Sequence, residues 1–177
     1  MKWNKEDVYR TTKCFSPRNN GYPGGFPQGF IRYLKTMGWW GEKRCYLCSG
    51  KVEDPDSIRV DLEPSVNPTH LEDASNTSLE GESFDCVIID PPYSKDLAEK
   101  LYKKGKYFKG INAFTKEGNR ILKHGGLIIS LSYEIPNRPK NCDLIACVGV
   151  YQVMGVSWMR CLAVWKKRFP VGKGGRE

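Results

Sequence analysis

The sequence predicts an α/β fold in which an open sheet is closed at its C-terminal end by an antiparallel hairpin. Short runs of β-branched residues, such as Val87–Ile89, alternate with segments whose apolar residues recur at helical spacing. Two strand-like runs end at an acid, Asp61 and Asp90, which is where nucleotide-binding α/β folds place ligand-binding groups. The last two strand-like runs are separated only by residues 154–157, and this spacing indicates a hairpin.

The most informative stretch is the strand Val87–Ile89 together with Asp90, Pro91, Pro92 and Tyr93, which follow it. Neither proline offers an N–H to a sheet, so the chain leaves the sheet at Asp90. Tyr93 is then held near the carboxyl end of the strand, where open α/β sheets bind ligands. The carboxylate and a proline-stiffened carbonyl accept N–H bonds, and the aromatic face stacks. This set suits a flat base with an exocyclic amine.

Size and composition indicate a single basic domain. The 177 residues include 28 Lys and Arg against 20 Asp and Glu, for a net charge of +8. This excess favours an anionic partner, most often nucleic acid, although a solvated basic surface gives the same count. There is no signal-peptide pattern and no apolar run of the about 18 residues that a membrane span needs. Several of the seven cysteines lie in apolar runs, so we expect a cytoplasmic protein with reduced thiols and no membrane partner.

The chain divides into an irregular segment 1–25, a single domain 26–168 and a basic flexible tail 169–177. The predicted elements are a helix 28–37 ended by Gly38, strands 44–47, 57–61, 69–74 and 87–89, a lysine-rich segment 94–109, a helix 111–122 closed by Gly125 and Gly126, a strand 127–133, and hairpin strands 143–153 and 158–165. Elements of both kinds in this order predict one α/β domain.

An apolar strand followed by Asp-Pro-Pro-Tyr resembles the amino-methyltransferases that use S-adenosylmethionine, of which the DNA adenine-N6 methyltransferases are the best known. The order of elements from residue 26 to about 166 is similar to the Rossmann-like class I methyltransferase fold, a mostly parallel sheet with one antiparallel strand from a closing hairpin. The resemblance implies S-adenosylmethionine as cofactor. It also implies that Asp90, Pro91, Pro92 and Tyr93 form the catalytic motif.

The resemblance further implies a set of cofactor contacts. The helix that Pro27 opens and the loop after the first strand would lie against the methionine part. Asp61 would bind the ribose hydroxyls, with Glu63 as the alternate. Asp73 would accept from the adenine amine, with Glu72 as the competing choice. The implied cofactor contacts are Phe26, Pro27, Tyr46, Leu47, Ser49, Gly50, Asp61, Asp73 and Asp90.

The first loop departs from the family pattern at two positions. Arg44 stands where the family has an acid, and Cys48 stands where it has the first loop glycine, which normally allows close approach to the cofactor. Cys45 and Cys48 also form a CxxC. No second CxxC at suitable spacing accompanies it, so we expect no zinc and no other metal.

The segment 94–109 contains six lysines and three aromatic residues next to the Asp-Pro-Pro-Tyr motif. Such a segment can follow a phosphate backbone and stack bases, although a helix with a solvated lysine face has the same composition. The predicted nucleic-acid contacts are Tyr93, Lys95, Lys100, Lys103, Lys104 and Lys106. Little of the chain remains for a separate recognition domain. Sequence recognition would therefore fall to short loops, to this segment, or to a partner chain, either a second copy or a separate specificity subunit.

Three functions are compatible with these features. The first is methylation of adenine N6 in DNA. The second is methylation of a base amine in RNA, at adenine N6 or guanine N2. The third is a non-catalytic nucleic-acid-binding module that keeps the fold, which Arg44 and Cys48 favour and the intact motif from Asp90 to Tyr93 opposes.

Overall fold

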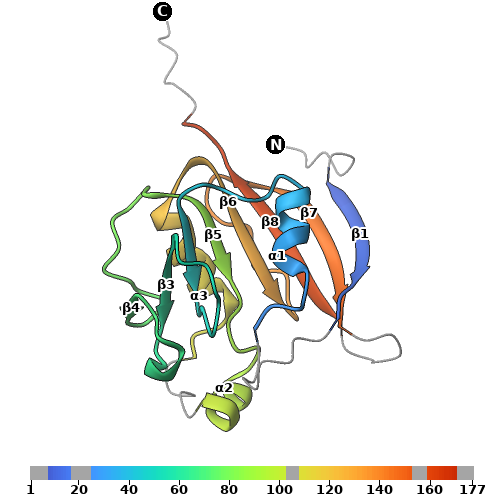
Figure 1. Ribbon diagram of the computed structural model, residues 1–177. Coiled ribbons are helices and arrows are strands. Elements are labelled where there is room, and N and C mark those ends of the chain that lie inside the picture. Colours follow the sequence, from blue (N-terminus) through green and yellow to red (C-terminus); the bar gives the residue numbers. More distant parts are fainter. Residues whose placement is uncertain (1–7, 17–24, 103–107, 153–158, 171–177) are drawn as a thin grey trace, which may run out of the picture.

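The computed structural model describes residues 8–16, 25–102, 108–152 and 159–170, which form one eight-stranded sheet with three helices (Figure 1). The strands are β1 (Tyr9–Cys14), β2 (Arg44–Leu47), β3 (Ser57–Asp61), β4 (His70–Leu71), β5 (Phe84–Ile89), β6 (Leu122–Ser132), β7 (Cys142–Tyr151) and β8 (Arg160–Lys167). The helices are α1 (Phe30–Thr36), α2 (Lys95–Tyr102) and α3 (Ile111–Ile121), and Pro64–Val66 form a short 3-10 turn.

The strand order is β1-β7-β8-β6-β5-β2-β3-β4. The strands from β4 to β6 pair in parallel, and β8 runs antiparallel between β6 and β7. The predicted fold class is therefore confirmed, as a mostly parallel sheet closed by a C-terminal antiparallel hairpin. No helix in the described part of the chain is long and apolar enough to cross a membrane.

The central strand β5 is buried because helices cover both of its faces. Its side chains alternate, so that Cys86 and Ile88 pack in the layer of α1 while Val87 and Ile89 pack in the layer of α3. A strand buried on both faces reads as a continuous apolar run, which is the pattern of residues 86–89. Helix α2 instead lies beyond the end of the sheet, next to the point where β5 ends (Figure 1).

Two parts of the chain differ from the sequence-based expectation. The sequence predicts an irregular segment over residues 1–25, but Tyr9–Cys14 form β1, which pairs in parallel with β7 at the edge of the sheet. Most β1 side chains are exposed, so the strand carries no apolar alternation that could have predicted it. The second difference is the end of α3, which stops at Ile121 rather than at Gly125 and Gly126. Leu122 is already part of β6 and is fully buried.

Candidate active site

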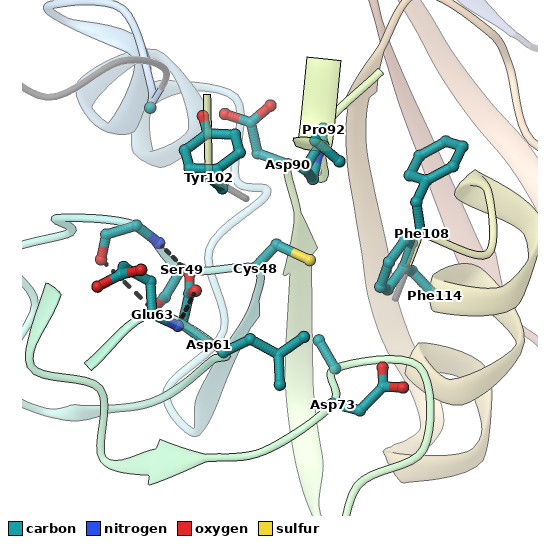
Figure 2. A pocket seen from close by; sticks show the side chains of 15 residues that line it. Cys48, Ser49, Asp61, Glu63, Asp73, Asp90, Pro92, Tyr102, Phe108 and Phe114 are labelled. Atoms are coloured by element: carbon teal, nitrogen blue, oxygen red, sulfur yellow. Dashed lines mark hydrogen bonds between the residues drawn. The ribbon is translucent and has the colours of Figure 1, made fainter. Parts of the chain in front are cut away.

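The strands β2, β3 and β5 end at one cleft, which is open to solvent (Figure 2). The cleft is lined by Gly25, Cys48, Ser49, Gly50, Asp61, Leu62, Glu63, Asp73, Ala74, Asp90, Pro92, Ala98, Tyr102, Phe108 and Phe114. Acids at or just after the ends of three different strands therefore face one space, which three aromatic rings also line. The carboxyl edge of an open α/β sheet is the usual place for such a site.

The loop after β2 forms one side of the cleft. Cys48 adopts the left-handed backbone conformation (φ 58°), at the position where the resemblance expects glycine. The N–H of Ser49 donates to the carbonyl of Val60 at 3.0 Å, which ties the loop to β3. Left-handed conformation in a residue other than glycine has a strain of order 1 kcal/mol. The loop therefore keeps its turn with a cysteine at this position. Burial raises the pKa of the Cys48 thiol well above the ordinary value.

Asp61, the last residue of β3, holds this loop in place. Its Oδ2 accepts from the N–H of Gly50 at 2.8 Å, and its Oδ1 accepts from the N–H of Glu63 at 3.0 Å (Figure 2). Burial raises the pKa of Asp61, while the backbone N–H groups of Gly50 and Glu63 act in the opposite direction. Asp61 thus lies in the cleft as predicted and also fixes the turns on both sides of it.

The predicted adenine ligand, Asp73, also lines the cleft. Its Oδ1 accepts from the N–H and the hydroxyl of Ser75, and its Oδ2 pairs with Lys109 Nζ at 3.0 Å. Burial raises its pKa, but the bonds from Ser75 and Lys109 outweigh this and leave the pKa below the ordinary value. The competing acid, Glu72, is not part of the lining and accepts hydrogen bonds from Ser78.

Asp90 is the first residue after β5, and its side chain is only 6% exposed. The hydroxyl of Tyr93 donates to Asp90 Oδ1 at 3.1 Å, and Arg160 Nη1 donates to the same hydroxyl oxygen at 2.8 Å. Arg160 Nη1 also lies 4.0 Å from Asp90 Oδ2. Burial raises the pKa of Asp90 to about 6, against the charge of Arg160 and the bond from Tyr93. Asp90 is therefore ionised at neutral pH but close to protonation.

The prediction for Tyr93 is that its ring is offered to a base. Its ring packs against Tyr133 with centroids 4.3 Å apart and planes at 45°, and Tyr93 is not part of the cleft lining. Pro92 does line the cleft, while Pro91 is buried behind it. Within the motif, Asp90 and Pro92 face the cleft, and the hydroxyl of Tyr93 supports Asp90 from behind.

The sequence did not predict the three aromatic rings that line the cleft, which are Tyr102, Phe108 and Phe114. Figure 2 shows Tyr102 beside Asp90, with Phe108 and Phe114 on the opposite side. Tyr102 ends α2 and Phe114 lies on α3, and burial raises the pKa of Tyr102 to about 12. The aromatic content of segment 94–109 was a signal for Tyr102 and Phe108 only, because Phe114 lies outside it. Nothing in the sequence indicated that these rings face the acids.

Four predicted cofactor contacts lie outside the cleft. Phe26, Pro27 and Tyr46 line a second hollow on the α1 side of the sheet, and Leu47 is fully buried in the core. The reason is the alternation of side chains along β2, which turns Tyr46 into the α1 layer, where its hydroxyl donates to Asp54 at 3.0 Å. The other five lie in the cleft, namely Ser49, Gly50, Asp61, Asp73 and Asp90.

Arg44, the other departure from the family pattern, has a structural role on that second side. Its Nε and Nη2 donate to the two carboxylate oxygens of Asp54 at 2.8 and 2.9 Å, and its Nη1 donates to the carbonyls of Gly41 and Glu42. The guanidinium also lies over the Trp40 ring. Arg44 does not line the cleft, so it does not interfere there.

The CxxC does not form a joint site. Cys45 is fully buried in the core, whereas Cys48 lies in the cleft. Within the residues that the structure describes, no group of three or more His, Cys, Asp or Glu side chains is placed to hold a metal ion.

Two of the predicted nucleic-acid contacts, Lys95 and Lys100, are exposed on α2 beside the cleft. The others from this segment, Lys103, Lys104 and Lys106, lie outside the described residues. Lys109 is exposed and pairs with Asp73, one of the acids that line the cleft.

No protein-family model and no curated protein matches the chain. Among solved structures, the yhhF protein of Escherichia coli, named as a candidate methyltransferase, has a TM-score of 0.49 at 14% identity, covering 84% of this chain and 92% of that one. A candidate methylase from Haemophilus influenzae has a TM-score of 0.46 at 11% identity, covering 84% and 92%. The antibiotic-resistance methyltransferase Kmr has a TM-score of 0.45 at 9% identity, covering 83% and 95%. Such low values do not assign a family, so the function must be argued from the cleft.

Because burial raises the pKa of Asp90 to about 6 from the ordinary 3.8, its charge destabilises the folded state. This destabilisation is absent below about pH 4 and complete above the folded pKa. Asp90→Asn should therefore raise the free energy of unfolding at pH 8 by about 1–3 kcal/mol, at about 1.4 kcal/mol per pKa unit, and leave it unchanged near pH 4. Urea unfolding at both pH values measures the difference.

The matched control is Asp54→Asn. The bond from Arg44 lowers the pKa of Asp54, so its charge stabilises the fold and the substitution should destabilise the protein at pH 8. If Asp90→Asn also destabilised the protein at pH 8, the charge of Asp90 would not be unfavourable in the folded state.

Proposed function

We propose that this protein transfers a methyl group from S-adenosylmethionine to the exocyclic amine of a nucleic-acid base, with adenine N6 in DNA as the first candidate. The observation that carries the proposal is the placement of Asp90. A buried carboxylate at the end of the central strand borders a cleft that also holds the acids Asp61 and Asp73. Two residues of the Asp-Pro-Pro-Tyr motif, Asp90 and Pro92, line this cleft.

The residues of the cleft fit the cofactor. The Asp61 carboxylate has acceptor capacity beyond its bonds from backbone N–H groups, so it can accept from a ribose hydroxyl while still holding Gly50 and Glu63. Phe108, Phe114 and Ala74 offer an apolar surface for a flat purine. When bound, S-adenosylmethionine supplies an electrophilic methyl group, so the protein mainly has to align the accepting amine.

The residues of the motif provide that alignment. The Asp90 carboxylate and the carbonyl of Pro91 would accept the two N–H groups of the amine, which favours a more nucleophilic nitrogen. The hydroxyl of Tyr93 holds Asp90 Oδ1 in place. With a pKa of about 6, Asp90 is ionised at neutral pH and is also able to receive the proton that the amine loses after transfer. A target in a duplex would first have to be flipped out, at a few kcal/mol.

The direct test is the transfer of labelled methyl groups to DNA, RNA and free nucleosides, followed by nucleoside analysis. Asp90→Ala should reduce the rate at least about 100-fold, because an acceptor for the amine is removed. Its affinity for S-adenosylmethionine should stay close to that of the wild type, because the ribose acids are untouched. Transfer at the wild-type rate by Asp90→Ala would refute this mechanism.

The same assay separates the alternatives. Label recovered in adenine N6 or guanine N2 of RNA, and none in DNA, would select the RNA enzyme. A folded wild type that binds nucleic acid and transfers no label to any substrate would select the non-catalytic module. Cys48 favours that module at the level of sequence, but its backbone makes the turn that a glycine would make.

The two candidate ribose acids are separable. Asp61→Asn should weaken S-adenosylmethionine binding by about 1.5–3 kcal/mol, which is tenfold or more, because a charged acceptor is removed and the loop loses a tether. Glu63→Gln, with the same change of charge two residues away, should have a smaller effect. Isothermal titration calorimetry measures both affinities, and the reverse order would make Glu63 the ribose ligand.

We further propose that exposed lysines of α2 bind the phosphate backbone. Changing Lys95 and Lys100 to Gln should lower the slope of log K against log salt by about 0.9 for each phosphate of duplex DNA that is no longer neutralised. The control changes two exposed lysines away from the cleft, Lys116 and Lys140. Fluorescence anisotropy over a salt series measures the slopes, and equal slopes in both double variants would place the DNA elsewhere.

A further inference from the structure

Arg160 is the first residue of β8, and the closing hairpin brings it to the edge of the sheet where β5 ends. It is 67 positions from Tyr93 in the chain, yet Nη1 of Arg160 donates to Tyr93 Oη at 2.8 Å. Its side chain is 8% exposed, and Asp90 is its acidic neighbour at 4.0 Å. A buried arginine is unfavourable unless its charge is paired and hydrogen-bonded.

The two buried arginines of the sheet differ in how well they are bonded. Arg44 is 8% exposed and has hydrogen bonds from Nε, Nη1 and Nη2. Arg160 is 7% exposed, and its Nη2 meets no acceptor among the described residues. Arg44 is bonded as a residue that stabilises the fold. Arg160 lies beside the motif with Nη2 unbonded, and a buried polar atom without a partner is more often found at a functional position than in the structural core.

The hydrogen bonds have one possible direction. Arginine can only donate, so the oxygen of Tyr93 accepts from Arg160 and its single proton points to Asp90 Oδ1. This fixes one carboxylate oxygen of Asp90 from behind. Donation from a cation also makes the phenol a stronger donor to the carboxylate.

We propose that Arg160 is a positioning residue of the amine-binding site, which acts through the hydroxyl of Tyr93 to fix the orientation and the charge of the Asp90 carboxylate. The catalytic part of this inference rests on the proposed function. Its electrostatic part concerns the protein alone and is measurable without substrate.

The groups around Asp90 and its immediate neighbours come from several elements and include Arg160 on β8, Tyr93 in its own loop, Tyr102 on α2, Tyr133 after β6, Cys48 after β2 and Asp61 on β3. Among these described groups Arg160 is the cation, and it acts against the burial that raises the pKa of Asp90. An opposite charge within about 4–6 Å lowers the pKa of a carboxyl group by about 1–3 pH units. Removing the charge should shift the pKa by that amount in the other direction.

The experiment compares Arg160→Gln, Arg160→Lys and Tyr93→Phe with the wild type. The pKa of Asp90 is followed by carbon NMR of aspartate-labelled protein, with the signal assigned by its disappearance in Asp90→Asn. Arg160→Gln should raise this pKa by about 1–3 pH units. Arg160→Lys should leave the pKa of Asp90 close to the wild-type value, because lysine carries the same positive charge. Tyr93→Phe should also raise the pKa of Asp90, because the hydroxyl that connects Arg160 to Asp90 is removed while Arg160 remains.

Methyl transfer is measured in parallel from pH 5 to pH 9. The acid limb of the kcat profile should move upward with the pKa of Asp90 in Arg160→Gln, so that the loss of rate is about tenfold or more near pH 6 and smaller at pH 9. The control is Arg138→Gln, which removes an equal charge from an ion pair with Asp143 outside the cleft. Its profile should match the wild type.

Folded Arg160→Gln with a wild-type pKa for Asp90 and an unmoved acid limb would overturn the inference. If that variant does not fold, Tyr93→Phe decides in its place, and a wild-type pKa there has the same meaning. A wild type that transfers no methyl group to any substrate would refute the proposed function. The NMR titration would still show whether Arg160 controls the charge of Asp90.

Discussion

The charge of one buried carboxylate is the constraint on which this site depends. Asp90 follows a strand whose neighbours on both sides are also strands and whose two faces are covered by different helices. A carboxylate in that position loses its hydration, and the loss raises its pKa to about 6. The protein keeps it ionised at neutral pH with one cation and one phenol, both supplied from the side away from the cleft.

This constraint connects the closing hairpin to the chemistry of the cleft. β8 lies antiparallel between β6 and β7, and its register with β6 places Cys161 opposite Ser132. Arg160, one residue earlier, therefore reaches the end of the sheet near Tyr133 and the motif. The hairpin completes the core through Leu162 and Val164 and delivers the cation with its first residue. In this fold the last strand is thus part of the site, although the motif lies 67 residues earlier.

The sequence predicted those features that depend on local chemistry. β3 forms at Ser57–Asp61 as expected, and the chain leaves the sheet at Asp90, because β-branched residues favour strands and two prolines stop one. The features it did not predict depend on contacts between distant segments. The bond from Arg160 to Tyr93, the aromatic lining of the cleft and the pairing of β1 all arise from the placement of other elements. Tyr46, which was expected to contact the cofactor, lies outside the cleft for a simpler reason. The alternation of side chains along β2 directs it to the other face of the sheet.

The two departures from the family pattern have different physical consequences. Arg44 occupies the position of an acid but turns to Asp54, so the change lies on the far side of the sheet. Cys48 lies inside the cleft at the position where the resemblance expects glycine, and its left-handed conformation has a strain of order 1 kcal/mol. The bond from Gly50 to Asp61 and the bond from Ser49 to Val60 hold the turn closed against that strain. Asp61 therefore has two roles, because it holds the shape of the loop and is also the acid proposed to bind the ribose.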